Sequence, residues 1–303
     1  MPDAPLVILN PTAGGGRAGR LLGWLRERLA QRPDARLEVT RRPGDAEAWA
    51  AGAAPAHDRV VAVGGDGTVQ EVVNGLLAGG AGATLGVVPV GTGNDLARSL
   101  GLPTDPADAW RSAIGHGEQP IDVAHAEGAD GRVRWFTSAG GIGFDAQVAA
   151  AMATRRGWQR GRAAYLLTTL AELRRFSNRR VVIRLDGTSI ERQVLFVAIA
   201  NGEFYGAGMR IAPGAAVDDG LLDLCIVGDV SRLTALRQLA NLYRGTHVEH
   251  PKVEMARGRE VVIEGDAGTL VHLDGEPFGS LPLRVTLHPA RLTVAGGSAR
   301  LTA

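Results

Sequence analysis

The feature that most restricts the fold is an apolar run that ends in a glycine-rich loop and continues directly as a helix. The run spans residues 60–63, and the loop reads Gly64-Gly65-Asp66-Gly67-Thr68. A buried strand that turns into a helix in this way presents backbone N–H groups and a helix N-terminus to an anion. Asp66 would repel that anion unless a cation or a hydroxyl proton lay between them. A phosphate with Mg²⁺ is therefore the simplest interpretation.

The same succession of strand, glycine-rich loop and helix occurs twice more before residue 101. Residues 6–9 lead into the loop 10–16, and a later strand leads into the loop 91–95, which ends in a second acid, Asp95. Strands and helices that alternate in this way predict a doubly wound parallel α/β domain. Because such loops gather at the carboxyl edge of the sheet, we expect a ligand site there. Tight turns alone would explain the glycines but not Asp66 and Asp95.

The pattern changes after about residue 120, where short β-type runs dominate. Turn pairs such as Asp186-Gly187 and Asp219-Gly220 separate these runs, and a helix is expected over residues 231–243. The second half of the chain therefore predicts a C-terminal β-sandwich domain. We expect the two domains to abut, with a ligand cleft between them.

The composition excludes several classes of protein. Lys and Arg number 33 against 32 Asp and Glu, and a net charge of +1 gives no case for nucleic-acid binding. No apolar run approaches the ~20 residues of a transmembrane segment, and the first residues do not resemble a signal peptide. The single cysteine, Cys225, excludes an internal disulfide and lies in an apolar run that predicts a buried thiol. The sequence predicts a soluble cytoplasmic protein.

A set of motifs spread over nearly the whole chain carries a family resemblance. In order they are Asn10-Pro11 with Gly14 and Gly16, Thr40 with Gly44-Asp45-Ala46, residues 64–68, Pro89 with residues 91–98, Asp122, Gly143-Phe144-Asp145, Asp218-Asp219-Gly220 and Leu273-Asp274-Gly275-Glu276-Pro277. Their order and spacing resemble the bacterial diacylglycerol kinase and lipid kinase family, which is related to sphingosine kinases. One departure is Leu96, where many members of the family have Phe.

The resemblance implies an α/β nucleotide-binding domain over residues 1–120, to which about 286–303 return, and a β-sandwich lipid-substrate domain over 121–285. It implies ATP bound on the glycine-rich loops, and the expected contacts are Asn10, Thr40, Gly64, Gly65, Asp66, Gly67, Thr68, Val69, Gln70, Gly91, Thr92, Gly93 and Asn94. The expected catalytic acids are Asp66, Asp95 and Asp122, in a network tied to Mg²⁺, with Glu276 as the general base. A second, structural Mg²⁺ is implied at the carboxylate of Asp219 and the carbonyls of Ala216 and Leu221.

These features predict an ATP- and Mg²⁺-dependent kinase that transfers the γ-phosphate to the hydroxyl of a lipid, either diacylglycerol or a sphingoid-like molecule. Such an enzyme would be cytoplasmic and would act at the inner membrane surface. The arginine-rich region 155–180 is either a solvated helix face or a contact with anionic headgroups. Asp274 either orients Glu276 or caps its turn.

Two alternatives remain open. One is a kinase similar to NAD kinase that acts on a soluble substrate, and the other is a nucleotide or lipid sensor without catalysis. The sequence also leaves open which lipid accepts the phosphate, which nucleoside triphosphate is used, and whether the chain forms a homodimer.

Overall fold

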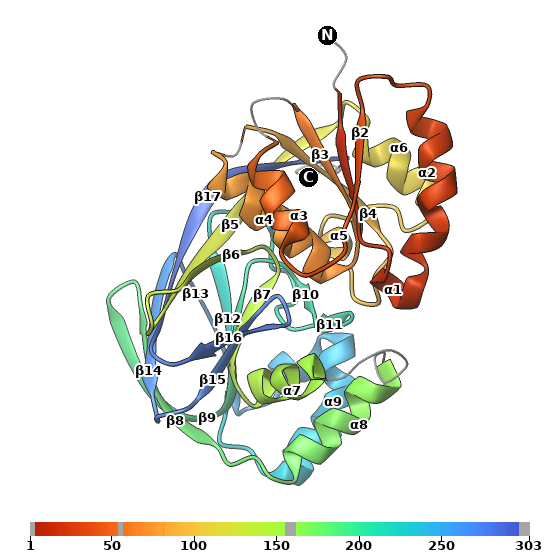
Figure 1. Ribbon diagram of the computed structural model, residues 1–303. Helices are drawn as coiled ribbons and strands as arrows, with labels where there is room; N and C mark the ends of the chain where they lie inside the picture. The colour runs from red at the N-terminus through yellow and green to blue at the C-terminus, as the bar shows by residue number, and fades with distance from the viewer. Residues whose placement is uncertain (1–3, 54–56, 81, 155–161, 297–303) are drawn as a thin grey trace. The chain divides into compact units, whose positions relative to one another are not determined.

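The computed structural model describes residues 4–53, 57–80, 82–154 and 162–296. Contacts within the chain divide it into two compact units (Figure 1). The N-terminal unit comprises the described residues within Met1–Ile121 and Ala290–Ala303, and the C-terminal unit comprises those within Asp122–Pro289. The strands β5 (Glu118–Gly128) and β17 (Leu283–Ala295) each contribute residues to both units.

The N-terminal unit is built on a parallel sheet in the order β2-β1-β3-β4, beside which the last part of β17 adds a further parallel strand. The bounds are β1 Leu6–Leu9, β2 Arg36–Val39, β3 Arg59–Gly64 and β4 Thr84–Pro89. All residues of β1, β3 and β4 are buried, as expected for parallel strands that are covered on both faces. This order places the three glycine-rich loops after neighbouring strands.

Helices connect these strands. They are α1 Ala13–Gly16, η1 Ala18–Leu21, α2 Leu22–Leu29, α3 Asp45–Ala51, α4 Asp66–Ala78, α5 Asp95–Ser99 and α6 Pro106–Ala113. Leu25 of α2 and Trp110 of α6 pack with Val7, Val61 and Val88 of the sheet in one core cluster. Helix α4 comes so close to α3 that a Cβ on Gly75 would lie 2.2 Å from the carbonyl oxygen of Glu47. The glycine is therefore required for the packing of α4, the helix that begins at Asp66.

The C-terminal unit is mostly antiparallel. Its strands are the remainder of β5 and β17 together with β6 Val133–Phe136, β7 Ala139–Gly143, β8 Arg179–Leu185, β9 Thr188–Ala200, β10 Phe204–Tyr205, β11 Met209–Arg210, β12 Leu222–Gly228, β13 Val253–Gly258, β14 Glu260–Gly265, β15 Leu270–Leu273 and β16 Glu276–Ser280. They pair in the order β16-β15-β7-β9-β8-β14-β17, while β12 joins β9 to β13 and β5 pairs with β6 and β17.

Two apolar clusters fill the C-terminal unit. One lies among strands and includes Phe136, Ile183, Ile199 and Val285. The other includes Phe144 of α7 and lies where α7 (Phe144–Ala153), α8 (Arg162–Leu173) and α9 (Arg232–Arg244) gather on one side of the strands (Figure 1). A short helix, η3 (Thr246–Glu249), follows α9.

The predicted fold class is confirmed: a parallel α/β unit is followed by a β-sandwich. The predicted helix over 231–243 corresponds to α9, and Cys225 is buried as predicted. Among the described residues, no helix is both long and apolar enough to cross a membrane.

Candidate active site

The first glycine-rich loop of the N-terminal unit is tied to the second by Asn10. The Nδ2 atom of Asn10 donates to Oγ1 of Thr68 at 3.0 Å, and Oδ1 of Asn10 accepts from the backbone N–H of Thr12 at 3.1 Å. Thr40 follows β2 at the same edge of the sheet, where its N–H donates to the carbonyl of Leu9 at 2.9 Å. The parallel order of β2, β1 and β3 thus brings together predicted nucleotide-binding residues that are far apart in the sequence.

Asp66 joins the second loop to the third. It is the first residue of α4, and its two carboxylate oxygens accept the backbone N–H groups of Asn94 at 2.8 Å and Asp95 at 2.6 Å. The glycines permit this approach: a Cβ on Gly91 would lie 2.6 Å from Cα of Gly65, and one on Gly93 would lie 2.5 Å from Oδ2 of Asp66. Two of the three predicted catalytic acids, Asp66 and Asp95, are therefore neighbours.

Two arginines hold the third loop. Nη2 of Arg17 donates to the carbonyls of Val90 and Gly91, both at 3.2 Å, and Nε of Arg98 donates to the carbonyl of Gly93 at 2.8 Å. The sequence analysis assigned a role to neither of these arginines. The two guanidinium groups add positive charge at this edge of the sheet, which favours the binding of phosphate there.

The loops also offer oxygen atoms to a cation. Oδ1 of Asn94 is buried and has no hydrogen-bond partner among the described residues, and it lies on the loop whose N–H groups hold the carboxylate of Asp66. Mg²⁺ prefers carboxylate and carbonyl oxygens and keeps several of its waters. These residues of the N-terminal unit fit a magnesium ion that accompanies bound phosphates.

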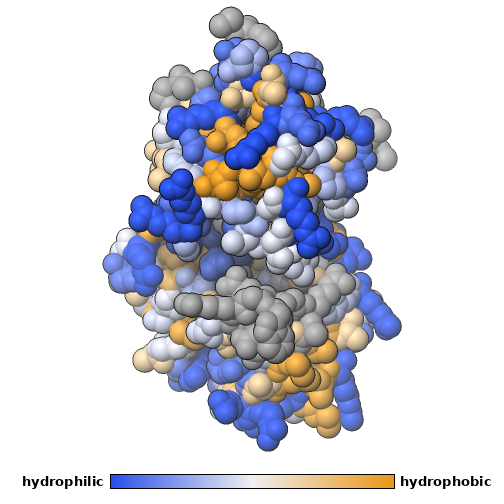
Figure 2. All heavy atoms as spheres, turned by 45° about the vertical axis from the view of Figure 1, so that its right-hand side comes forward, coloured by the Kyte–Doolittle hydropathy of each residue, from blue (hydrophilic) through white to orange (hydrophobic). Residues whose placement is uncertain are grey.

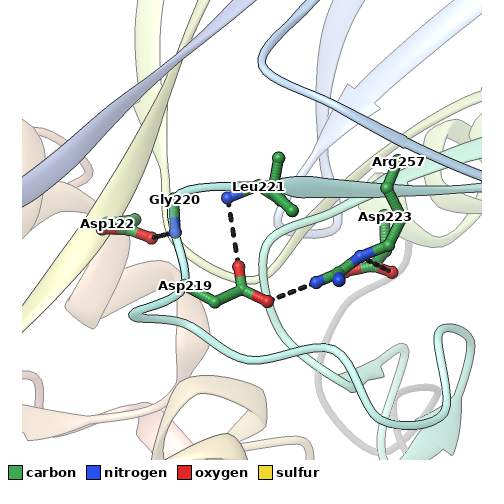
Figure 3. A network of polar contacts seen from close by, with 6 residues as sticks. All are labelled: Asp122, Asp219, Gly220, Leu221, Asp223 and Arg257. Carbon is green, nitrogen blue, oxygen red and sulfur yellow. Dashed lines mark hydrogen bonds and ion pairs between the residues drawn. The ribbon is translucent and has the colours of Figure 1, made fainter.

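Asp122 belongs to the C-terminal unit and is 2% exposed. Its backbone N–H donates to the carbonyl of Val217 at 2.6 Å, and its Oδ2 accepts the N–H of Gly220 at 2.6 Å. Nδ2 of Asn201 donates to the backbone carbonyl of Asp122 at 2.9 Å. The third predicted acid is therefore held by the loop that precedes β12 (Figure 3).

The same loop contains the residues expected to bind a structural Mg²⁺. Oδ1 of Asp219 accepts the N–H of Leu221 at 3.0 Å, while Oδ2 forms an ion pair with Arg257. Nε of Arg257 also pairs with Asp223 at 3.0 Å (Figure 3). Ala216 is buried. Among the described residues, no group of three or more His, Cys, Asp or Glu side chains is arranged to hold a metal ion.

Glu276 follows a two-residue turn that connects β15 to β16. Both turn residues are left-handed, with φ of 47° at Asp274 and 83° at Gly275, which is the backbone that a tight hairpin requires. The carboxylate of Asp274 accepts three backbone N–H groups, those of Thr137, Ser138 and Ala139, each at 3.0 Å. Asp274 thus anchors the turn to the start of β7, while Glu276 is exposed.

A buried pair lies behind this turn. Nδ1 of His272 accepts the N–H of Gly275 at 3.2 Å, so Nε2 carries the proton and donates to Oδ2 of Asp145 at 3.4 Å. Burial raises the pKa of Asp145, and the bond to His272 opposes this shift. The ring of Tyr205 stacks on His272, with 6.1 Å between centroids, and burial followed by the charge of Asp145 raises the pKa of Tyr205. Sequence reasoning gave His272 no role.

Helices α8 and α9 expose large apolar side chains. We call five residues the apolar helix face, and each of them is between 41% and 64% exposed: Leu166, Leu167, Leu233, Leu236 and Tyr243. In Figure 1, α8 and α9 lie at the lower right. Figure 2 brings that side forward and shows exposed apolar atoms in the lower part of the view. An apolar cavity of about 60 Å³ lies between the two helices and β9, and Leu170, Leu173, Leu239 and Leu242 line it.

The arginine-rich region is only partly described. Residues 155–161, which include Arg155, Arg156 and Arg160, lie outside the described residues. Arg174 and Arg175 are exposed directly after α8. Arg180 pairs with Glu191, so it is not free to meet a headgroup without losing that partner.

Comparisons with known proteins agree with the geometry. Residues 4–126 match the model of the diacylglycerol kinase catalytic domain, and residues 138–296 match that of the YegS C-terminal NAD kinase β-sandwich-like domain. A diacylglycerol kinase of Mycobacterium tuberculosis is 34% identical over 293 residues, which are 95% of this chain and 93% of that protein. A probable lipid kinase YegS-like protein of Pseudomonas fluorescens is 33% identical over 91% of this chain and 87% of its own length.

The likeness extends to solved structures. The crystal structure of a diacylglycerol kinase from Bacillus anthracis matches with a TM-score of 0.74 at 26% identity, covering 97% of each chain. The predicted resemblance and the predicted enzyme class, a phosphotransferase with an alcohol group as acceptor, are confirmed. The chain belongs to the bacterial diacylglycerol kinase and lipid kinase family.

Proposed function

We propose that this lipid kinase uses ATP and Mg²⁺ to phosphorylate the hydroxyl of diacylglycerol or a sphingoid-like lipid, with Glu276 as the general base. The observation that carries the proposal is the carboxylate of Asp66, which joins two glycine-rich loops through the N–H groups of Asn94 and Asp95. Loops joined in this way present backbone donors to phosphates and keep an acid beside them. Phosphoryl transfer needs this combination of positioning and charge neutralisation.

The N-terminal unit would bind the nucleotide. Backbone N–H groups of the three loops and the start of α4 would hold the phosphates, with Arg17 and Arg98 adding positive charge nearby. Asp66, Asp95 and Oδ1 of Asn94 would hold Mg²⁺, which neutralises charge on the transferred phosphoryl group when it is bound. Asp122 would complete the acidic network.

Glu276 would accept the proton of the lipid hydroxyl. The hydroxyl oxygen then forms a bond to the γ-phosphorus while the bond from that phosphorus to the β-phosphate oxygen breaks, which releases ADP. An exposed carboxylate on an anchored turn suits this role because a general base must reach its proton at hydrogen-bond distance.

One experiment distinguishes the three candidate functions. Labelled ATP, MgCl₂ and a panel of lipids dispersed in detergent would be incubated with the protein, and NAD would be included as a soluble acceptor. The proposal predicts labelled lipid, and a loss of turnover of about 10²–10⁴-fold in Glu276→Gln. Label in NAD alone would favour the NAD kinase-like alternative, whereas nucleotide binding without any product would favour the sensor.

We also propose that the enzyme acts while bound peripherally to the inner membrane surface through the apolar helix face. The sequence of α9 contains three arginines and no acid, and no residue of α9 is buried. A helix with exposed leucines and basic residues lies in a membrane interface and is attracted by anionic lipids.

Vesicle co-sedimentation tests the membrane face. The double variant Leu167→Glu with Leu233→Glu should lose binding to vesicles of phosphatidylcholine and phosphatidylglycerol. The matched control is Val133→Glu on β6, because Val133 is 61% exposed and Leu167 is 64% exposed. Equal sedimentation of all three proteins would contradict the proposal. If the parent protein is a dimer and the double variant is a monomer, the apolar helix face would instead be assigned to self-association.

A further inference from the structure

A guanidinium pairs with the carboxylate at which the family resemblance implies a structural metal ion, that of Asp219. The loop that contains Asp219 and Leu221 is held by Arg257 of β13, the strand that pairs with β12. Arg257 lies directly opposite Asp223 in the register of these two strands. This register aims the arginine at the loop that leads into β12, and Figure 3 shows the side chain between Asp219 and Asp223.

Unlike Asp66, whose partners are neutral backbone N–H groups, Asp219 already has a positive charge on one of its oxygens. Oδ1 accepts the N–H of Leu221 at 3.0 Å, and Oδ2 pairs with Nη2 of Arg257. A divalent cation at Asp219 would have to displace the guanidinium or share its carboxylate with it. The donor set of this loop therefore does not fit a bound Mg²⁺ as long as Arg257 is in place.

The same loop controls a predicted catalytic acid. Gly220 lies between Asp219 and Leu221, and its N–H donates to Oδ2 of Asp122 at 2.6 Å. The direction of this N–H depends on the conformation of the loop. The contacts of Asp219, the residue directly before Gly220, restrict that conformation. Arg257 is thus connected to Asp122 through one residue of the loop backbone.

We propose that the guanidinium of Arg257 takes the place of a structural divalent cation at this loop and positions the N–H of Gly220 on Asp122. Arg257 is a positioning residue, because among the described residues its side chain pairs with Asp219 and Asp223 and not with Asp122. The effect on turnover rests on the proposed kinase function, whereas the effect on the loop does not.

The charges at the site support the exchange. Arg257 faces two carboxylates. Its own side chain is 46% exposed, and the side chains of Asp219 and Asp223 are 30% and 12% exposed. Without the arginine, two neighbouring carboxylates would remain, and such a pair attracts a divalent cation.

The test compares melting temperatures in EDTA and in MgCl₂ for the parent protein and for Arg257→Met. The parent should melt at the same temperature in EDTA and in MgCl₂, since the guanidinium of Arg257 already supplies positive charge to its loop. Arg257→Met should melt lower in EDTA and recover by roughly 2–4 °C in MgCl₂, because the ion would bind only the folded loop. Both measurements are made without nucleotide, so that no phosphate is present to bind Mg²⁺ at the glycine-rich loops.

The matched control is Arg192→Met. Arg192 pairs with Glu254 on β13 at 3.2 Å, and its side chain is 49% exposed. The substitution therefore removes a comparable ion pair from the same sheet. Its melting temperature should not respond to Mg²⁺. The double variant Arg257→Met with Asp219→Asn should lose the recovery, which would assign the ion to this carboxylate.

A rise in the melting temperature of the parent with MgCl₂ that Asp219→Asn abolishes would overturn the proposal, because it would show a metal at this loop beside Arg257. Absence of any Mg²⁺ response in Arg257→Met would overturn it as well. In the kinase assay, kcat of Arg257→Met should fall about tenfold while the KM for ATP stays unchanged, and Arg257→Lys should recover part of the loss. If the parent phosphorylates no lipid, the proposed function fails, but the melting measurements still decide the role of Arg257.

Discussion

The turn before Glu276 allows a sharp test of the account. Asp274 and Glu276 lie two residues apart, and replacing each carboxylate with an amide should affect the stability of the protein differently. Asp274→Asn and Glu276→Gln each replace a carboxylate with an amide. The carboxylate of Asp274 accepts three N–H groups from residues that are at most 5% exposed, whereas Glu276 is exposed. We expect Asp274→Asn to destabilise the protein and Glu276→Gln to leave its stability unchanged.

The hydrogen bonds set the size of the effect. In Asp274→Asn, one oxygen can still accept the N–H groups of Ser138 and Ala139, but the amide nitrogen would face the N–H of Thr137. A buried donor left without an acceptor costs about 1–3 kcal/mol. Since about 1 kcal/mol lowers the melting temperature by roughly 2–4 °C in a unit of this size, Tm should fall by at least ~2 °C. Asn tolerates the left-handed backbone, so strain does not add to the cost.

Glu276→Gln changes an exposed side chain, and such substitutions usually alter stability by no more than about 0.5 kcal/mol. Thermal melting and urea unfolding measure both variants, and the kinase assay measures their turnover. Equal melting temperatures for the two variants would refute the assigned role of Asp274. Full turnover by a destabilised Asp274→Asn would show that Asp274 caps the turn without orienting Glu276.

Two further predictions concern buried groups. In His272→Asn the side-chain oxygen occupies the position of Nδ1 and can accept the N–H of Gly275, whereas in His272→Gln the side chain reaches Asp145 but leaves that N–H without its acceptor. Steady-state kinetics should therefore show a larger loss of kcat in His272→Gln, and the opposite order would show that the contact with Asp145 matters more. Burial raises the pKa of Cys225 to about 12, so a thiol reagent at pH 8 should label it only as fast as the protein unfolds. Rapid labelling of the folded protein would contradict the buried position.

The order of strands and loops in the N-terminal unit could be predicted from the sequence. Hydrophobic runs that end in glycines recur at short intervals, and the parallel sheet then brings residues such as Asn10 and Thr68 to one edge. Sequence spacing could not show that the carboxylate of Asp66 would accept the two N–H groups at the end of the third loop, where α5 begins. That contact depends on how closely Gly65 and Gly91 approach each other.

Long-range contacts in the C-terminal unit were beyond sequence reasoning. The pair of Asp145 and His272 spans 127 positions, and the position of Arg257 opposite Asp223 depends on the register of β12 and β13. Neither pair has a local pattern in the sequence, because partners in an antiparallel sheet are selected by the pairing of whole strands. The expected boundaries of the domains and the roles of Asp66, Asp95, Asp122 and Glu276 stay predictions.

The central claim is that this chain transfers phosphate from ATP to a lipid hydroxyl with Glu276 as the base. The most direct measurement is the rate of formation of labelled phospholipid from labelled ATP, MgCl₂ and diacylglycerol in mixed vesicles, for the parent protein and for Glu276→Gln. We predict labelled phosphatidic acid from the parent and a rate lower by about 10²–10⁴-fold from the variant, at an unchanged melting temperature. An equal rate from both proteins would contradict the role of Glu276, and no labelled product with diacylglycerol or a sphingoid base would contradict the proposed reaction.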